Sequence, residues 1–327
     1  MAMSTLRFNL VLPGLDPKVH SEMHKAFLDM ATFADQNGFT AVQFEEHHGA
    51  ENGWSPTPLL LAGMALARTT RVNATIMALL APLHDPLRIA EDIAVLDLVA
   101  PGRLMVVLGV GYRPSEYAAH GKEWSRRGKL MDEVVDTLLK AWTGEPFEYR
   151  GTTVRVTPRP ATQPHPMVFV GGTSQASARR AARFGLPFFP AAHLPELEAY
   201  YNAQCAEHGT TGFCLMPGEQ TAMTHVATDP DKAWAEIGHH FLHEAQTYAG
   251  WQTADIHSAV HSHAKTVDDL RAEGIYRILS PEECVAEGQH QGQGAAFNLH
   301  PMCGGMPIDK GWESLHLYAE QVLPKIP

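Results

Sequence analysis

The sequence has few of the residues that mark several common protein classes. Its 327 residues include only four cysteines, and none of them forms a CxxC pair: Cys205, Cys214, Cys284 and Cys303. This irregular spacing argues against a disulfide framework and against a zinc ribbon. Basic residues are also scarce, with 25 lysines and arginines against 36 aspartates and glutamates and a net charge of −11. We therefore expect neither nucleic acid nor an anionic membrane surface as a partner.

Long apolar runs are missing as well. The first residues lack the basic region and apolar stretch of a signal peptide, and no run has the length of a membrane span. The expected location is therefore the cytoplasm, with no membrane partner. The composition, with 45% apolar and 19% charged residues, is typical of a soluble globular protein with a substantial core.

Short apolar segments alternate with segments of helical periodicity along the chain. We predict eight strand-then-helix units, with strands at residues 6–12, 40–44, 72–80, 104–108, 168–170, 186–189, 221–227 and 295–299. Such alternation implies parallel strands and right-handed crossovers. Eight buried strands favour an α/β fold of the (β/α)8 TIM-barrel class over an open sheet. We expect one domain over residues 1–327, with excursions from the barrel at about 144–166 and 248–294.

The expected active site lies where the strands end, because such a barrel places its functional groups at the carboxyl ends of its strands. After the fifth strand, Gly171-Gly172-Thr173-Ser174 leads into an Ala/Arg-rich helix with Ser177 in its first turn. Thr173 or Ser174 is a suitable N-cap, and the free N–H groups beside three hydroxyls would bind a phosphate. The alternative is an ordinary capped helix, which many α/β proteins contain.

Two histidines follow the second strand, in the sequence Glu46-His47-His48. Polar groups at the end of an apolar strand must be solvated, paired or functional. Histidine serves as a general acid or base near neutral pH, so one histidine could be catalytic and the other structural, or both structural. Adjacent histidines do not share a face of a regular element, and no histidine spacing with a matching carboxylate is apparent. We therefore expect no metal site.

Two further strand-end segments are suited to contact a planar ligand. The motif Gly109-x-Gly111 follows the fourth strand, but Pro114 stands where a dinucleotide-binding fingerprint has its third glycine. We interpret this segment as a loop whose backbone passes close to a planar ring, with Arg113 free to reach an anion or a substrate. The apolar run 77–82 is either core or the floor beneath an aromatic cofactor.

Four segments together resemble the bacterial-luciferase-like family of flavin-dependent monooxygenases. They are GFTAVQFEEHHG, LARTTRVNATIMALLAPLHDPLRIAEDIAVLDLVAPGRLMVVLGVGYRPSEY, PHPMVFVGGTSQASARRAARFGLP and HPMCGGMPIDKGWESLHLYAEQVLP, and they cover most of the chain in the family's order. The resemblance implies a (β/α)8 barrel and a reduced FMN cofactor or, in some branches, the deazaflavin F420. It also implies a homodimer.

The resemblance assigns a role to the residues at two strand ends. His47 matches the catalytic histidine of the family, and the carboxylate that precedes it could orient its ring. His48 is then the structural member of the pair. Thr173, Ser174 and Ser177 match the residues that contact the flavin phosphate.

The same resemblance applies to the strand ends that would face the flavin ring. Met77-Ala78 falls where family members often carry a non-proline cis peptide against the isoalloxazine. Gly109 stands in place of the reactive cysteine of true luciferases, and Val110 in place of the arginine beside it. This departure argues against light emission and leaves flavin binding intact, with Arg113 as a substitute for the missing arginine.

From these observations we expect an enzyme, a flavin-dependent monooxygenase. It would use reduced FMN and O2 to oxidise a small apolar or weakly polar organic substrate. A separate NAD(P)H flavin reductase would supply the reduced flavin, because the sequence shows no second nucleotide motif. The alternatives are an F420-dependent oxidoreductase on the same barrel and a non-catalytic flavin-binding protein.

Overall fold

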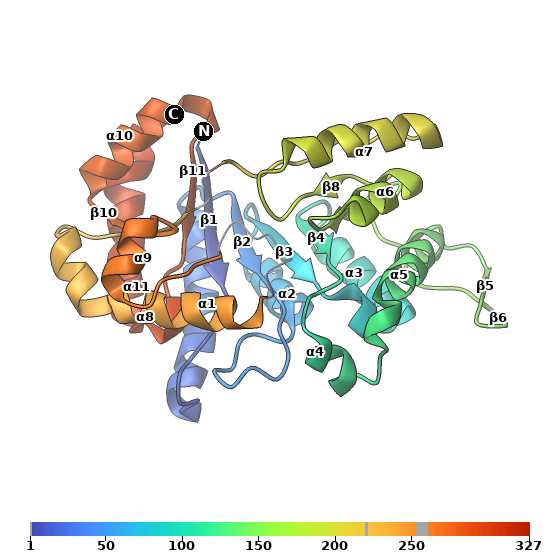
Figure 1. Ribbon diagram of the computed structural model, residues 1–327, viewed down its shortest axis with the longest axis horizontal. Helices are drawn as coiled ribbons and strands as arrows, with labels where there is room; N and C mark the ends of the chain where they lie inside the picture. Colours follow the sequence, from blue (N-terminus) through green and yellow to red (C-terminus); the bar gives the residue numbers. More distant parts are fainter. Residues whose placement is uncertain (1, 220–221, 253–260) are drawn as a thin grey trace.

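The strands of the core form one parallel sheet (Figure 1). The computed structural model describes residues 2–219, 222–252 and 261–327. The nine-stranded sheet has the order β10-β9-β11-β1-β2-β3-β4-β7-β8. Its strands are β1 (Met3–Phe8), β2 (Ala41–Phe44), β3 (Asn73–Leu79), β4 (Leu104–Leu108), β7 (Met167–Gly171), β8 (Phe188–Phe189), β9 (Met223–Val226), β10 (Tyr276–Leu279) and β11 (Ala296–Leu299). The predicted α/β fold of the TIM-barrel class is confirmed.

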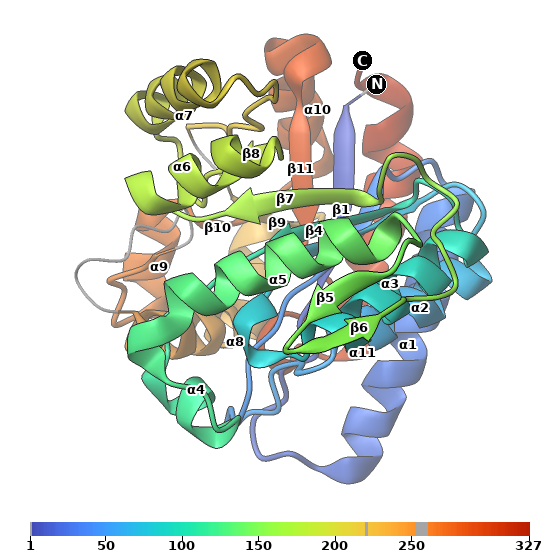
Figure 2. The same ribbon diagram turned by 90° about the vertical axis from the view of Figure 1, so that its right-hand side faces the viewer.

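Helices alternate with these strands along the chain, as the sequence pattern predicts. They are α1 (Pro17–Gln36), α2 (Pro58–Arg68), α3 (Pro86–Val99), α4 (Pro114–Ala119), α5 (Arg127–Trp142), α6 (Gln175–Phe184), α7 (Pro195–His208), α8 (Pro230–Trp251), α9 (Val267–Glu273), α10 (Pro281–Gln291) and α11 (Ile308–Leu317). The predicted excursion at 144–166 contains a two-stranded hairpin, β5 (Phe147–Tyr149) with β6 (Thr152–Val154). Figure 2 shows this hairpin on the outside of the molecule, beside α5.

The core lies between the sheet and its helices. Phe8, Phe27 and Phe44 pack together with ring centroids 5.6–6.2 Å apart, which joins β1, α1 and β2. Across the sheet, Trp142 is fully buried and its indole Nε1 donates a hydrogen bond to the Ala90 carbonyl at 3.0 Å, which ties α5 to α3. Burial of such side chains contributes about 1.5–3 kcal/mol each to folding, so the strand ends are attached to a rigid support.

Two sequence predictions about the fold are wrong. The described residues contain nine sheet strands where we predicted eight, and the stretch 248–294, which we expected to be an excursion from the barrel, contributes the strand β10 to the sheet and contains α10. Strand β10 escapes detection because only four residues alternate between buried and half-buried positions. The start of α10 was visible, since Ser280 and Glu283 form a capping box around Pro281. Residues 253–260 of that stretch lie outside the described part of the chain.

One helix departs from the outer layer. Helix α8 lies across the carboxyl ends of the strands, and Glu244 in its third quarter contacts Arg7 and Asn9 at the end of β1. The last turn of α8, with Tyr248 and Trp251, therefore reaches the end of β2. In the described ranges, no helix is long and apolar enough to cross a membrane.

Candidate active site

The register of the sheet brings the predicted site segments to one edge. Phe8, Phe44 and Ile76 are neighbours across β1, β2 and β3, so the residues that follow β2 lie beside Met77. Farther along the sheet, Leu108 pairs with both Leu79 and Val170. Gly109 and Gly171 therefore end adjacent strands, next to the Met77–Ala78 peptide. The expectation that these segments meet at the carboxyl ends is correct.

His47 is buried at this edge, with both ring nitrogens in hydrogen bonds. Its Nδ1 lies 3.0 Å from Glu116 Oε1, and its Nε2 lies 3.0 Å from the Tyr112 hydroxyl. A carboxylate only accepts hydrogen bonds, so Nδ1 carries a proton, and Nε2 shares the second hydrogen bond with the Tyr112 hydroxyl. Arg113 donates to the same Glu116 oxygen at 3.0 Å. We call His47, Tyr112, Arg113 and Glu116 the His47 cluster.

Glu116 corrects our expectation about what orients His47. We expected the carboxylate that precedes the histidine, but the partner is Glu116, which is 69 residues away on the short helix α4. Burial alone would raise the pKa of Glu116, but hydrogen bonds from His47 and from the His48 backbone, with the charge of Arg113, hold it below its ordinary value. Its second oxygen, Oε2, is buried and has no hydrogen-bond partner among the described residues. A single glutamate in a short helix carries no sequence signal for this role.

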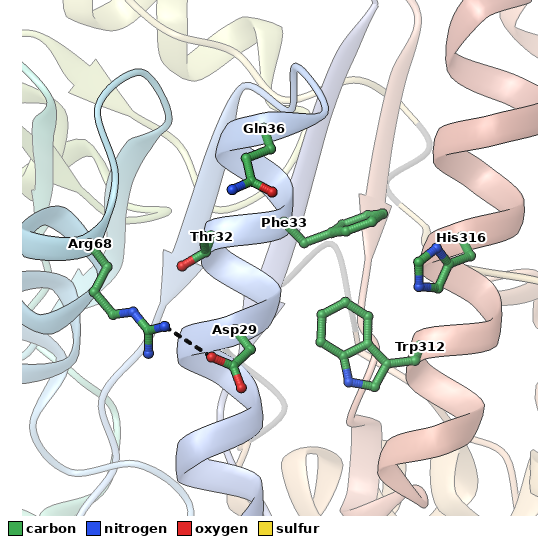
Figure 3. A pocket seen from close by; sticks show the side chains of 7 residues that line it. All are labelled: Asp29, Thr32, Phe33, Gln36, Arg68, Trp312 and His316. Carbon is green, nitrogen blue, oxygen red and sulfur yellow. Dashed lines mark hydrogen bonds and ion pairs between the residues drawn. The ribbon is translucent and has the colours of Figure 1, made fainter.

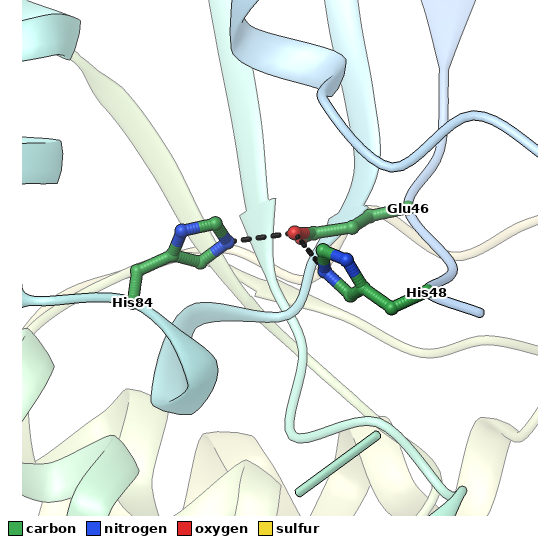
Figure 4. A group of neighbouring side chains, drawn as sticks. All are labelled: Glu46, His48 and His84. Atoms are coloured by element: carbon green, nitrogen blue, oxygen red, sulfur yellow. Dashed lines mark hydrogen bonds and ion pairs between the residues drawn. The ribbon is translucent and has the colours of Figure 1, made fainter. Parts of the chain in front are cut away.

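Glu46 instead holds two other histidines (Figure 4). His48 Nε2 and His84 Nε2 donate to the same oxygen, Glu46 Oε1, at 2.8 and 2.7 Å. The Leu80 backbone N–H donates to the other oxygen, Oε2, at 2.5 Å. Burial alone would raise the pKa of Glu46, but these hydrogen bonds lower it to about 2. We call Glu46, His48 and His84 the Glu46 cluster; sequence reasoning missed His84.

Aromatic rings enclose His47 on several sides. The ring centroids of Trp54, Tyr112, Tyr248 and Trp251 lie 4.7–6.2 Å from the centroid of the imidazole. Trp54 is buried, and its indole N–H has no hydrogen-bond partner in the described ranges. Burial, with the neighbouring Tyr248, raises the pKa of Tyr112 well above its ordinary value, so the phenol remains protonated. The enclosure is apolar and keeps water away from the imidazole.

The segments at the ends of β3 and β4 pack directly on each other. The peptide Met77–Ala78 is cis, as the resemblance predicted. A Cβ on Gly109 would lie 2.8 Å from the Cβ of Ala78, and the Gly109 N–H donates to the Leu79 carbonyl at 2.8 Å. Glycine at this position is therefore required by the contact between the two strand ends. Gly111 follows in the left-handed region and leads to Tyr112 and Arg113.

The predicted phosphate segment forms the amino end of helix α6. Ser174 is the N-cap, and it forms a capping box with Ser177. Gly172 has φ +142, and a Cβ there would lie 2.7 Å from Ser177 Oγ. Thr173 is half-buried and Ser174 is exposed, so solvent reaches the first turn. Exposed N–H groups of a helix amino end with adjacent hydroxyls suit a phosphate, and the residues fit the terminal phosphate of FMN.

A second set of ionisable groups lies beneath the aromatic enclosure. The Arg7 guanidinium forms ion pairs with Glu45 and, at 2.7 Å, with Glu244. His300 Nε2 lies 2.9 Å from Glu244 Oε2, which is ion-pair distance, but the two groups are not aligned for a hydrogen bond. Burial alone would raise the pKa of Glu244, but His300 and Arg7 hold it well below its ordinary value. We call Arg7, Glu45, Glu244 and His300 the Arg7 cluster. Arg7 lies 5.8 Å over the ring of Trp54, which also packs against His47, so Trp54 lies between the two clusters.

A surface cavity lies away from this edge, on the outer helices (Figure 3). It encloses about 360 Å³ and is lined by Asp29, Thr32, Phe33, Gln36, Arg68, Trp312 and His316. These residues come from α1, α2 and α11, and none of them belongs to the strand ends. The cavity is therefore separate from the His47 cluster.

Comparison with known proteins agrees with this geometry. The family model of the luciferase-like monooxygenases matches residues 7–288. The FMNH2-dependent dimethylsulfone monooxygenase of Pseudomonas putida is 28% identical over 166 residues, which cover 47% of this chain and 45% of that protein. The chain spans about half the length of the curated relatives that it matches.

Solved structures resemble the whole chain. The monooxygenase RslO1 from Streptomyces bottropensis has a TM-score of 0.76 and 25% identity, covering 98% of this chain and 99% of its own. An F420-dependent secondary alcohol dehydrogenase, in complex with an F420–acetone adduct, has a TM-score of 0.67 and 17% identity, covering 100% and 99%. The fold and the family match define the class of luciferase-like proteins, in which relatives are named flavin-dependent monooxygenases. The chain belongs to the luciferase-like monooxygenase family.

Proposed function

We propose that this enzyme uses reduced FMN and O2 to oxidise a small apolar or weakly polar organic substrate, with His47 as the residue that holds and moves a proton. The observation that carries the proposal is the His47 cluster, a buried imidazole between a phenol and a carboxylate at the carboxyl ends of the strands. Reduced flavin, when bound, supplies the oxygen chemistry, and the protein supplies position, protons and dryness.

The residues that would hold FMN lie along one edge of the sheet. The amino end of α6, with Thr173, Ser174 and Ser177, would bind the phosphate. The isoalloxazine would lie against Met77–Ala78, Gly109 and Gly111, near Arg113. The exposed first turn of α6 supports the phosphate assignment, and the shared register of β3, β4 and β7 supports the ring assignment.

The hydrogen bonds of His47 give its two nitrogens different tasks. Glu116 retains the proton on Nδ1, so Nε2 is the atom that would exchange a proton with a substrate that takes the place of the Tyr112 hydroxyl. The imidazole can take a proton at Nε2 because the positive charge that forms is stabilised by Glu116. The surrounding rings exclude water, which strengthens this interaction.

Reduced flavin must come from another protein. We propose a separate NAD(P)H flavin reductase as a partner, because the dimethylsulfone relative is named for its dependence on FMNH2 and no second nucleotide motif is visible in this sequence. We also propose a homodimer. Exposed apolar side chains on α2 and α3 support this, namely Leu60, Val95, Leu98 and Val99, and size-exclusion chromatography with light scattering of Leu98→Glu tests it.

Reconstitution decides between the cofactors. The purified chain is mixed with FMN, a flavin reductase and NADH under air, and separately with reduced F420. A panel of ketones, sulfones and aromatic compounds is followed for oxygenation in the first mixture and for reduction in the second. Oxygen incorporation from ¹⁸O2 with FMN alone supports the proposal. Hydride transfer with F420 alone would favour the second candidate, which the fold of the F420-dependent dehydrogenase keeps open. FMN binding without turnover across the panel would favour a flavin-binding protein.

A further inference from the structure

The Glu46 cluster has the composition of a metal site. Its three side chains come from different parts of the chain, Glu46 and His48 after β2 and His84 after β3, and they point toward one another (Figure 4). The side chain of Glu46 is fully buried, while those of His48 and His84 are 16% and 27% exposed. The carboxylate thus lies at the bottom and the imidazoles lie on the solvent side. Two imidazoles and one carboxylate form a set that binds divalent transition ions.

The distances suit a particular coordination geometry. The nitrogens lie 2.7 and 2.8 Å from Glu46 Oε1, and the three ligand atoms lie within 4.8 Å of one another. Neighbouring ligands of an octahedral ion with bonds of ~2.1 Å are about 3 Å apart, whereas tetrahedral zinc needs about 3.4 Å. The ligand atoms therefore have to move apart less to bind an octahedral ion than to bind tetrahedral zinc. The imidazoles are hydrogen-bond donors without the ion and become ligands after a change of tautomer.

The charge of the cluster distinguishes it from the other candidate group. Glu46 has no lysine or arginine in ion-pair contact within the described residues, so its buried negative charge faces only imidazoles and backbone N–H groups. Glu244, His300 and Cys303 also have ligand atoms close together. There, Arg7 already neutralises Glu244, and all three side chains are buried. Glu244 therefore has a permanent positive charge beside it, whereas the side chains beside Glu46 are potential metal ligands.

We propose that Glu46, His48 and His84 bind a divalent first-row transition ion of octahedral preference. The ion would join the loops after β2 and β3, because Glu46 also accepts from Leu80. It would also act on the loop after β4, because the His48 backbone N–H donates to Glu116 at 2.9 Å. Ion binding should therefore raise the melting temperature of the protein. This proposal is independent of the flavin chemistry and of the role of His47.

The test is calorimetric titration of the untagged, EDTA-treated protein with CoCl2 and with NiCl2. We compare the wild type with His84→Gln and His48→Gln, in which an amide still donates to Glu46, and with His239→Gln. His239 is the matched control because it belongs to another close histidine pair, with ring centroids 4.0 Å apart. Melting temperatures without metal show that each variant is folded.

The expected result is one ion per chain in the wild type and in His239→Gln, with at least ten-fold weaker binding in His84→Gln and His48→Gln. Cobalt should give the weak visible absorption of an octahedral complex. No saturable binding up to millimolar metal would overturn the proposal. Unchanged binding in the His84 and His48 variants would also overturn it, because the ion would then occupy some other histidines.

Discussion

Two groups of buried ionisable side chains lie next to each other at the carboxyl ends of the strands, and they are built differently. In the Arg7 cluster, the Arg7 guanidinium bridges two buried carboxylates, and the Glu244 side chain is 0% exposed. In the His47 cluster, an imidazole, a phenol and a half-buried guanidinium surround one carboxylate, and Glu116 Oε2 lacks a partner in the described part of the chain.

This difference separates a structural role from a functional one. A buried carboxylate with opposite charges around it is retained because removing one partner leaves the others unpaired. A buried imidazole beside a carboxylate can take up a proton in a reaction, because the carboxylate stabilises the positive charge that forms. We therefore expect changes in the Arg7 cluster to affect stability and changes in the His47 cluster to affect turnover. The four predictions below test this division.

The largest expected effect is on stability. Glu244→Ala should lower the free energy of unfolding by about 3–5 kcal/mol, because it leaves the buried His300 without its partner and removes one of the two carboxylates paired with Arg7. Glu236→Ala on the same helix is the control, since its ion pairs with Lys232 and Lys310 are exposed and should contribute at most about 1 kcal/mol. Urea denaturation measures both. Equal effects of the two variants would show that the Arg7 cluster is not structural.

The second prediction concerns turnover. His47→Ala should reduce coupled substrate oxidation at least about a hundred-fold, because general acid–base groups contribute roughly 10²–10⁴-fold. FMN affinity and melting temperature should change little. His48→Ala is the matched control. Full turnover in His47→Ala with loss in His48→Ala would show that we assigned the wrong histidine, and full turnover in both would place the proton chemistry elsewhere, with Arg113 or His300 as the next candidates.

The third prediction locates cofactor binding on the β7 side of the edge, away from the Arg7 cluster. Replacing Ser174 and Ser177 together by Ala should weaken FMN binding by about 1–3 kcal/mol, the usual contribution of charge-assisted hydrogen bonds. Riboflavin, which lacks the phosphate, should bind the double variant and the wild type equally. Flavin fluorescence quenching measures both affinities. Unchanged FMN affinity would remove the phosphate assignment.

The smallest expected effect is the pH dependence of stability from one carboxylate. The pKa of Glu244 is held well below its ordinary value of 4.5. Its stabilisation is therefore complete above pH 4.5 and is lost as the pH falls through the lowered folded-state pKa. Protonation of one group changes the free energy of unfolding by at most about 1.4 kcal/mol per pH unit. Between pH 6 and 3, the free energy of unfolding measured by urea denaturation should fall less steeply for Glu244→Gln than for the wild type. An equally steep fall in both proteins would mean that Glu244 is not ionised in the folded protein.

Local patterns predicted several features of the site correctly. Strand 104–108 has the predicted bounds, and the helix after the glycine turn has Ser174, one of the two predicted residues, as its N-cap. The cis peptide at Met77–Ala78 came from the resemblance and is present. These features depend on residues close in sequence, whose preferences act on the backbone directly. The assignment of His47 and of the flavin contacts remains a prediction.

The sequence alone determined the alternation of strands and helices, the order of the strand-end motifs and the family. Hydrophobic periodicity and capping act over a few residues, so they are visible in one dimension. Only the tertiary structure decided which carboxylate orients His47, that Glu46 joins His48 to His84, and that α8 brings Tyr248 and Trp251 over the imidazole. Apart from the local hydrogen bond between Glu46 and His48, those contacts join residues 38 to 204 positions apart, and no local preference specifies them.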